Sequence, residues 1–213
     1  MGRGRVAPLD GVEAVLSDMD GTLVDSDAAV ERAWSTWATE HGVEPAAALA
    51  IAHGNTAEST VRVLLPALGP ADVATAAARQ LALQYDDLAD VGPTKGAERL
   101  VALLTEGGWP WAVVTTADRR LAEARLTAAG LTVPLVITAD DISAGKPDPE
   151  GYLLAARRLG VAPERCLVVE DTAAGLAAGR AAGARTAALK GEDGDLRLAH
   201  LGELADLLAD GVP

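Results

Sequence analysis

Short apolar runs alternate with segments of helical periodicity along most of the chain. The runs that predict buried strands are 12–15, 111–115, 135–137, 165–169 and 185–189. The helices expected between them lie at about 95–106, at 118–129, from Asp148–Pro149 to Gly160, and from Ala173 to about Gly183. Strands that alternate with helices of this length indicate βαβ units. The pattern therefore predicts an α/β fold with a mostly parallel sheet.

The stretch from Asp27 to about Asp90 breaks this alternation, because it shows helical periodicity and almost no strand signal. One face of a first helix carries Val30, Ala33, Trp34 and Trp37. A second helix, expected to stop at Gly69–Pro70, carries Val61, Leu64, Leu65 and Leu68. A third is expected from about Ala71 to Leu88, with the anchors Leu81, Leu83 and Tyr85. The alternation resumes at Thr94, so these helices form an insertion.

Composition excludes several classes of protein. Apolar residues make up 49% of the 213 residues without any run of 18, so neither a membrane span nor a membrane partner is expected. The basic start, Met1 to Arg5, has no apolar segment behind it, and we expect no signal peptide. The single cysteine, Cys166, excludes a disulfide framework and favours a cytoplasmic protein.

The net charge of −13 argues against nucleic acid as a partner, because nucleic-acid binding depends on clustered lysine and arginine. The same charge repels anionic small molecules. A site for an anion in this chain therefore requires a local cation or a bound metal ion.

Two carboxylates stand two residues apart at the end of the first predicted strand. Asp18 and Asp20 point the same way from such a strand, and Gly21 lets the backbone turn away. Ligands of open α/β sheets bind outside the carboxyl ends of the strands. Adjacent acids repel each other unless a cation lies between them, and hard oxygen ligands suit Mg²⁺. The alternative is a solvated acidic turn in which both aspartates cap a helix.

Three later segments also end strands or loops with groups suited to phosphate or Mg²⁺. Thr115 and Thr116 end a buried strand, where a hydroxyl and an N–H group can hold a phosphate oxygen. Lys146 is one of three lysines beside fifteen arginines, in a loop that Pro147 keeps out of a helix. Glu170–Asp171 close another strand. Each segment has an ordinary alternative: the threonines as β-branched strand residues, Lys146 as a solvated loop residue, and Glu170–Asp171 as a helix cap. Together, the four segments indicate one site in which charged and polar groups surround a phosphate and a metal ion.

The four segments resemble the haloacid dehalogenase superfamily in its helical-cap branch. The matching motifs are Asp18-Met19-Asp20-Gly21-Thr22, Val113-Val114-Thr115, Gly145-Lys146-Pro147-Asp148-Pro149 and Val169-Glu170-Asp171-Thr172. The resemblance covers nearly the whole chain. It implies a Rossmann-like catalytic core, residues 1–25 and 94–213, and a helical cap domain, residues 26–93.

The resemblance also implies a phosphatase mechanism. Asp18 would attack phosphorus and form an aspartyl-phosphate, while Asp20 would serve as general acid and then general base. The implied Mg²⁺ ligands are the Asp18 carboxylate, the Asp20 carbonyl and Asp171, with Glu170 in support. The implied phosphate-binding groups are Thr115, Lys146 and the N–H groups of Met19, Asp20 and Thr116. The expected partner is a small phosphomonoester, and the expected state is a monomer or weak dimer.

Other reactions of the superfamily fit less well. The dehalogenases lack an acid at the position of Asp20, and phosphonate hydrolysis needs a cap lysine for which Lys95 is a poor match. Hexose-phosphate mutases share all four motifs, but they usually have a histidine where this chain has Val30. A non-catalytic phosphate-binding module is the remaining alternative, although every catalytic position is filled. We therefore expect a phosphatase.

The cap should determine the substrate. Residues 53–58, His-Gly-Asn-Thr-Ala-Glu, resemble a stretch of glycerol-3-phosphate and 2-deoxyglucose-6-phosphate phosphatases, with Thr56 where an arginine is frequent. His53, Asn55 and Glu58 are the candidate substrate-binding residues, and small sugar or polyol phosphates are the expected substrates. Alternatively, Asn55 and Glu58 have the spacing of a helix capping box, and Glu58 pairs with Arg62 on a helix surface.

Overall fold

The computed structural model describes residues 9–52 and 54–210. Within these residues six strands pair in parallel in the order β5-β4-β1-β6-β7-β8. They are β1 (Ala14–Ser17), β4 (Trp111–Val114), β5 (Val136–Ile137), β6 (Cys166–Glu170), β7 (Arg185–Ala188) and β8 (Leu196–Arg197). The predicted α/β class with a parallel sheet is confirmed.

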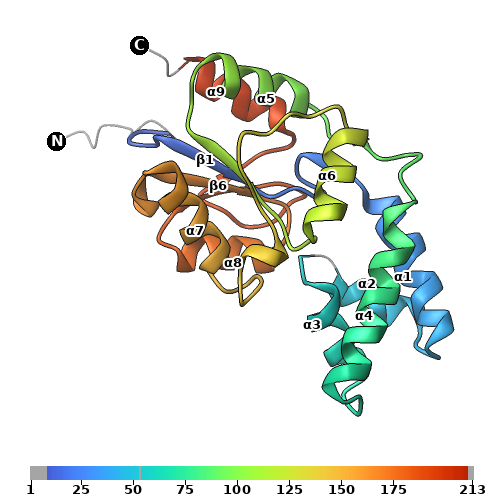
Figure 1. The fold of residues 1–213 in the computed structure, drawn as a ribbon. Helices are drawn as coiled ribbons and strands as arrows, with labels where there is room; N and C mark the ends of the chain where they lie inside the picture. Colours follow the sequence, from blue (N-terminus) through green and yellow to red (C-terminus); the bar gives the residue numbers. More distant parts are fainter. Residues whose placement is uncertain (1–8, 53, 211–213) are drawn as a thin grey trace.

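Helices cover both faces of this sheet (Figure 1). The helices are α5 (Ala97–Glu106), α6 (Arg119–Ala128), α7 (Glu150–Leu159), α8 (Ala173–Ala181) and α9 (Leu201–Asp210), with short 3₁₀ turns at Ala139–Asp141 and Pro163–Arg165. The first apolar core packs α5, α6 and α9 against one face, and the second packs α7 and α8 against the other. None of the described helices is both long and apolar enough to cross a membrane.

The central strand β1 explains why the sequence shows its strands as unbroken apolar runs. Val15 packs into the first core, whereas Ala14 and Leu16 pack into the second. A parallel strand covered on both faces has no polar side, so its sequence does not alternate. Since β1 lies between β4 and β6, its carboxyl end stands in the middle of one edge of the sheet.

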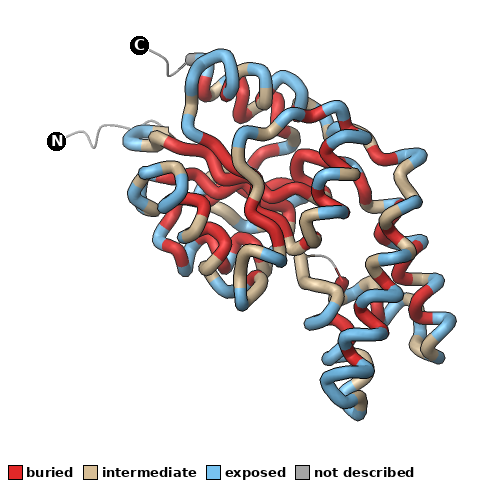
Figure 2. The backbone as a smooth tube through the Cα atoms, viewed as in Figure 1, coloured by how far each residue is buried: buried red, intermediate tan, exposed pale blue. Residues whose placement is uncertain are grey.

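Four helices form a separate part of the molecule, here called the helical unit (Figures 1 and 2). They are α1 (Asp27–Glu40), α2 (Pro45–Ala52), α3 (Ala57–Leu64) and α4 (Pro70–Tyr85). Their own apolar core centres on Trp37, which is fully buried and donates its indole N–H to the Ala76 carbonyl at 2.8 Å. Trp34 meets Trp37 edge to face with centroids 5.2 Å apart.

The helical unit joins the rest of the chain at two adjacent strands. β2 (Val24–Asp25) and β3 (Gly92–Pro93) pair antiparallel, so the chain leaves and returns side by side. Thr94 secures the return by donating its backbone N–H to the Leu23 carbonyl at 3.0 Å. This junction supports dividing the chain into 1–25 with 94–213 and 26–93, which stays a proposal.

Several elements differ from those expected from the sequence. Helix α2 was not predicted, because its alanine-rich sequence has no one-sided apolar pattern. Helix α3 ends at Leu64 rather than near Leu68, since Pro66 disfavours a helical conformation in the residue before it. Gly69 precedes α4, as its N-cap, instead of ending α3.

Other boundaries are shifted by one or a few residues. Helix α7 begins at Glu150 with Pro149 as its N-cap, and Asp148 instead accepts the Glu150 backbone N–H through Oδ1 at 2.9 Å. Helix α4 ends at Tyr85 rather than at Leu88. Strand β8 and helix α9 were not predicted from the sequence. Cys166 lies in β6 as expected and is buried.

Candidate active site

The predicted chemical groups meet at one edge of the sheet. β4, β1 and β6 are parallel neighbours, so their carboxyl ends lie side by side. Asp18 directly follows β1, Thr115 follows β4, and Glu170 ends β6. Lys146 joins them from the loop between β5 and α7.

Lys146 lies between two carboxylates and is itself buried, with 7% of its surface exposed. Its Nζ contacts the carboxylate of Asp18 and lies 2.6 Å from Oε1 of Glu170. Burial lowers the pKa of Lys146, but the negative charges of Asp18 and Glu170 outweigh burial and place that pKa above its ordinary value. The ammonium group therefore stays positive at the centre of the site.

Glu170 is fully buried, and its contacts hold both of its oxygens. Oε1 accepts from Lys146 and, at 2.8 Å, from the hydroxyl of Tyr152. Oε2 accepts the backbone N–H of Asp171 and both the N–H and hydroxyl of Thr172. A side chain at Gly175 would collide with this carboxylate. Glu170 is thus a fixed charge that orients its neighbours.

Three carboxylates are close enough to share a metal ion. Ligand oxygens of Asp18, Glu170 and Asp171 all lie within 4.8 Å of one another. Burial raises the pKa of Asp18 well above its ordinary value, and the charges of Glu170 and Asp171 add to this effect. An all-oxygen donor set with crowded negative charge fits Mg²⁺, so the predicted cofactor suits these residues.

Asp20 is not a member of this acidic cluster, because its carboxylate is held elsewhere. Its Oδ1 accepts from the Ser26 hydroxyl at 2.6 Å and from Nη1 of Arg125 at 2.7 Å. Only its backbone carbonyl was implied as a metal ligand. The structure thus places the Asp20 side chain toward the helical unit, where Ser26 is the N-cap of α1.

The remaining phosphate-binding candidates lie around the cluster. Thr115 is buried, and its hydroxyl oxygen accepts the Ala117 N–H at 3.1 Å. Thr115, Thr116 and Lys146 line one small pocket. The Met19 side chain belongs to the first apolar core, so only its backbone is free to serve the site.

The three candidates from the helical unit have different surroundings. Asn55 lines a cavity together with Asp20, Thr116 and Arg125. Its Nδ2 also donates to the Ile51 carbonyl at 2.9 Å. The capping-box reading is wrong, because the N-cap of α3 is Thr56, whose hydroxyl accepts the Ser59 N–H. His53 lies outside the described residues.

Glu58 stands apart from that cavity. Its carboxylate pairs with Arg62 at 2.6 Å on the surface of α3, and both side chains are 52% exposed. The predicted helix-surface pair is therefore present. A pair so exposed contributes little to stability.

The structure also reveals charged and polar residues that the sequence reading missed. Arg125 on α6 and Tyr152 on α7 are almost completely buried beside Asp20 and Glu170. Lys190 lies 3.0 Å from Oδ2 of Asp171 and 2.7 Å from Oδ2 of Asp27. For Arg125 a signal existed: it falls on the same helical face as Leu121 and Ala122, where an apolar residue is expected.

The chain matches known proteins along most of its length. The family model for haloacid dehalogenase-like hydrolase matches residues 12–183. Hexitol phosphatase A of Escherichia coli (strain K12) is 43% identical over 175 residues, which cover 82% of this chain and 81% of that protein. 2-Deoxyglucose-6-phosphate phosphatase 1 of Saccharomyces cerevisiae (strain ATCC 204508 / S288c) is 33% identical over 190 residues, 80% of this chain and 77% of that protein.

A solved structure shows the same fold at lower sequence identity. The β-phosphoglucomutase of Clostridium difficile superposes with a TM-score of 0.82, covering 91% of this chain and 93% of that chain. It is only 18% identical, so this likeness concerns the fold alone. The family match and the two phosphatases carry the assignment. They confirm the resemblance seen in the four motifs, and the chain belongs to the haloacid dehalogenase-like hydrolases.

Proposed function

We propose that this protein is a Mg²⁺-dependent phosphatase that hydrolyses small sugar or polyol phosphates through an aspartyl-phosphate. The observation that carries the proposal is the buried group of Asp18, Lys146, Glu170 and Asp171 at the carboxyl edge of the sheet. It combines a carboxylate nucleophile with a fixed ammonium group. Stabilising the charge of a transferring phosphoryl group is the main task of such a site.

The residues divide the reaction into two steps. An Asp18 oxygen attacks phosphorus, and the bond between phosphorus and the ester oxygen breaks. Asp20 gives a proton to the departing alcohol oxygen, then removes a proton from the water that hydrolyses the aspartyl-phosphate. Lys146 and Thr115 bind the phosphoryl oxygens. The contacts of Asp20 with Ser26 and Arg125 hold its carboxyl group in place during this exchange.

Mg²⁺ would be held by the Asp18 carboxylate, the Asp20 carbonyl and Asp171. Glu170 would orient these ligands, because its oxygens already accept hydrogen bonds from Asp171 and Thr172. When bound, the ion neutralises charge on the phosphoryl oxygens and on the nucleophile. The ion and Lys146 together make a positive site in a chain whose net charge is −13.

The substrate class rests on the relatives and on the helical unit. Hexitol phosphatase A and 2-deoxyglucose-6-phosphate phosphatase 1 are named for polyol and sugar phosphates. In this chain the helical unit would act as a cap over Asp20. The cavity between them is lined by Asn55, which could contact the alcohol part of the substrate.

The two alternatives find less support. A hexose-phosphate mutase usually has a histidine where this chain has Val30, and Val30 is an apolar residue of the helical-unit core. A non-catalytic phosphate-binding module would not need a nucleophile beside a fixed ammonium group. A mutase would yield an isomerised ester and a binding module no product at all, so both differ from a phosphatase in what an assay detects.

Phosphate release in the presence of Mg²⁺ tests the proposal. The assay compares hexitol, hexose and glycerol phosphates, β-glucose 1-phosphate and p-nitrophenyl phosphate. Release of inorganic phosphate from several of these esters is the expected result. Isomerisation of β-glucose 1-phosphate without release would identify a mutase, and no turnover of any ester by the folded protein would favour the binding module.

A further inference from the structure

A small cavity, partly open to solvent, lies beside Asp20, between the helical unit and the parallel sheet with its covering helices, here called the sheet body. Its walls come from both parts of the chain. Trp34 on α1 and Leu81 on α4 form apolar walls on one side, and Thr116 and Leu121 lie on the other. Arg125 and two glutamines of α4, Gln80 and Gln84, are among its polar lining residues.

Arg125 joins the catalytic side of the cavity to the helical unit. Only 2% of the residue is exposed. Its Nη1 donates to Oδ1 of Asp20 at 2.7 Å, and its Nη2 donates to Oε1 of Gln84 at 2.6 Å. Within residues 9–52 and 54–210, Asp20 is the only acid paired with this guanidinium group, and Gln84 is neutral. The charge of Arg125 is therefore already matched before any ligand enters.

The hydrogen-bond chain ends in free donors. Gln84 donates through Nε2 to Oε1 of Gln80 at 2.7 Å. The amide nitrogen of Gln80 then has no acceptor in the described part of the chain. Among the described residues four buried side-chain nitrogen or oxygen atoms have no partner, and two of them are Nε of Arg125 and Nε2 of Gln80. Both atoms belong to residues that line this one cavity. Unpaired donors in an apolar setting are costly, and native proteins rarely keep them without a use.

We propose that Arg125, Gln80 and Gln84 form a subsite for the hydroxyl groups of the substrate's alcohol part. This inference rests on the proposed function. The unpaired atoms are donors, so they select acceptor oxygens. The guanidinium charge is already matched by Asp20, so the subsite favours neutral hydroxyl oxygens over a second phosphate or a carboxylate. Trp34 and Leu81 offer apolar surface for the carbon chain that carries those hydroxyl groups.

A simpler structural role explains the arrangement poorly. The positions of Gln80 and Gln84 continue the buried face of α4 formed by Val73, Ala76 and Ala77. Apolar side chains at these positions would pack without any desolvated donor. A buried charged or polar network is frequently no more stable than an apolar replacement of similar volume. Recognition of a hydroxylated ligand accounts for the two donors left over.

The test uses two substrates of equal length that differ in their hydroxyl groups, D-glucitol 6-phosphate and n-hexyl phosphate. The measured quantity is the ratio of their kcat/KM values. The wild-type protein should favour the glucitol ester by at least about 100-fold, because a site built for hydroxyl groups rejects a ligand that lacks them. p-Nitrophenyl phosphate serves as an independent check that phosphate transfer occurs.

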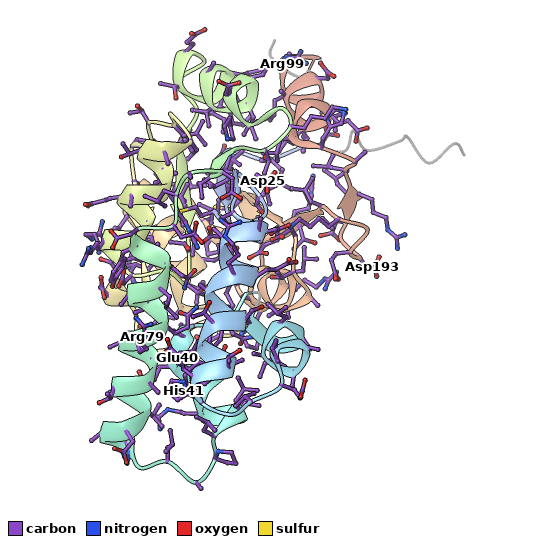
Figure 3. The ribbon with its side chains drawn as sticks, turned by 90° about the vertical axis from the view of Figure 1, so that its right-hand side faces the viewer. Asp25, Glu40, His41, Arg79, Arg99 and Asp193 are labelled. Atoms are coloured by element: carbon purple, nitrogen blue, oxygen red, sulfur yellow. The ribbon has the colours of Figure 1, made fainter. Side chains whose placement is uncertain are left out.

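Gln80→Leu should lower this ratio about tenfold or more, chiefly by reducing kcat/KM for the glucitol ester. Gln80→Met provides a second apolar variant of similar volume in case the first fails to fold. Arg79→Met is the matched control. Arg79 precedes Gln80 on α4 but faces outward, paired with Glu40 (Figure 3). The control should keep the wild-type ratio.

Four results would overturn the inference. A wild-type ratio near one, or an unchanged ratio in a folded Gln80 variant, would remove the hydroxyl subsite and leave the phosphatase standing. Equal losses on both esters, with a matching fall in melting temperature, would show a purely structural role. Absence of phosphate release from every ester, p-nitrophenyl phosphate included, would overturn the proposed function and this inference with it.

Discussion

Lys146 places a positive charge inside the candidate site of a strongly acidic protein. Its ammonium group is enclosed by Asp18 and Glu170, which keep it charged although it is buried. The arrangement fixes one positive charge in a place that solvent cannot screen. The ionised form of Asp18 is destabilised, because burial and the neighbouring charges of Glu170 and Asp171 raise the pKa of its carboxyl group. In the proposed function, this arrangement would place a reactive carboxylate at the site at some expense of stability.

Asp18→Asn tests this trade-off. The amide keeps the shape of the side chain but cannot attack phosphorus, so kcat should fall on the order of 10⁴-fold or more. The metal-free variant should melt at the same temperature as the wild type or a few degrees higher, because a desolvated carboxylate has been removed. Phosphate release and thermal unfolding measure the two effects. Activity within tenfold of the wild type would contradict the role of Asp18.

Cys166 allows a prediction on pH. Burial, with the charges of Glu164 and Glu13, raises the pKa of its thiol from 9.0 to about 11. Stability that depends on the neutral thiol is thus complete below about pH 9 and is lost as the pH rises toward 11.

At pH 8 iodoacetamide should alkylate the native thiol at least about 100-fold more slowly than the unfolded chain in urea. Native and unfolded protein can be compared by mass spectrometry over time. Equal rates would show that the thiol is exposed in solution.

Site residues at the ends of strands could be predicted from the sequence, whereas those inside helices could not. Asp18, Thr115 and Glu170 stand where apolar runs stop, so their position at the sheet edge follows from the pattern alone. Arg125 and Tyr152 lie inside helices, where the sequence does not show which neighbouring element each side chain meets. Their partners Asp20 and Glu170 are 105 and 18 residues away. Such contacts exist only once the whole sheet is assembled.

At the scale of elements, amphipathic helices were recognised better than uniform ones. Helix α1 carries a clear apolar stripe, and its expected residues are buried. Helix α2 is almost entirely alanine, leucine and isoleucine, so periodicity cannot show its buried side. Helix α4 was expected, but its apolar positions alone do not reveal that Gln80 and Gln84 share the buried face.

Two neighbouring residues between α2 and α3 have different expected roles. We expect Asn55 to contact the substrate and Thr56 to stabilise the start of α3. Asn55 lines the cavity, whereas Thr56 caps α3 through its hydroxyl. Asn55→Ala should change the relative kcat/KM among glycerol, pentose and hexose phosphates about tenfold, the worth of one polar contact.

Thr56→Ala is the matched control for this change. It should cost about 1 kcal/mol of stability through loss of the cap while keeping the substrate order. Urea unfolding and kinetics on each ester measure both effects. If Asn55→Ala lowers every ester equally together with stability, Asn55 is structural only.

At the scale of the whole molecule, the helical unit and the sheet body meet through polar contacts around the site. Gln84 contacts Arg125, Asp27 pairs with Lys190, and the Tyr85 hydroxyl donates to Asp118. Lys190 also contacts Asp171, so the start of α1 is linked directly to the acidic cluster. The apolar clusters of the two parts are distinct, but Ala29 on α1 belongs to the cluster of the sheet body, and Leu81 and Tyr85 on α4 pack against it. Charged and hydrogen-bonded contacts therefore stand beside apolar packing where the helical unit meets the candidate active site.

Metal binding should report on the assembled site, because Asp18 and Asp171 come together only in the folded chain. Mg²⁺ at 100 times its Kd should add about 2.7 kcal/mol to the free energy of unfolding and raise the melting temperature accordingly. Asp171→Asn should lose most of this gain. Asp193→Asn, which changes an aspartate that is 81% exposed and paired with Arg197, should keep it.

Activity and stability should respond differently to the two common divalent ions. A chelator should abolish phosphate release, and Mg²⁺ should restore it. Ca²⁺ should also raise the melting temperature yet inhibit turnover, because its longer bonds and higher coordination number displace the Asp18 oxygen that attacks phosphorus. Thermal unfolding and phosphate release in the same buffers separate binding from catalysis. Full activity in excess chelator, or no change in melting temperature with Mg²⁺, would show that the three carboxylates do not form a metal site.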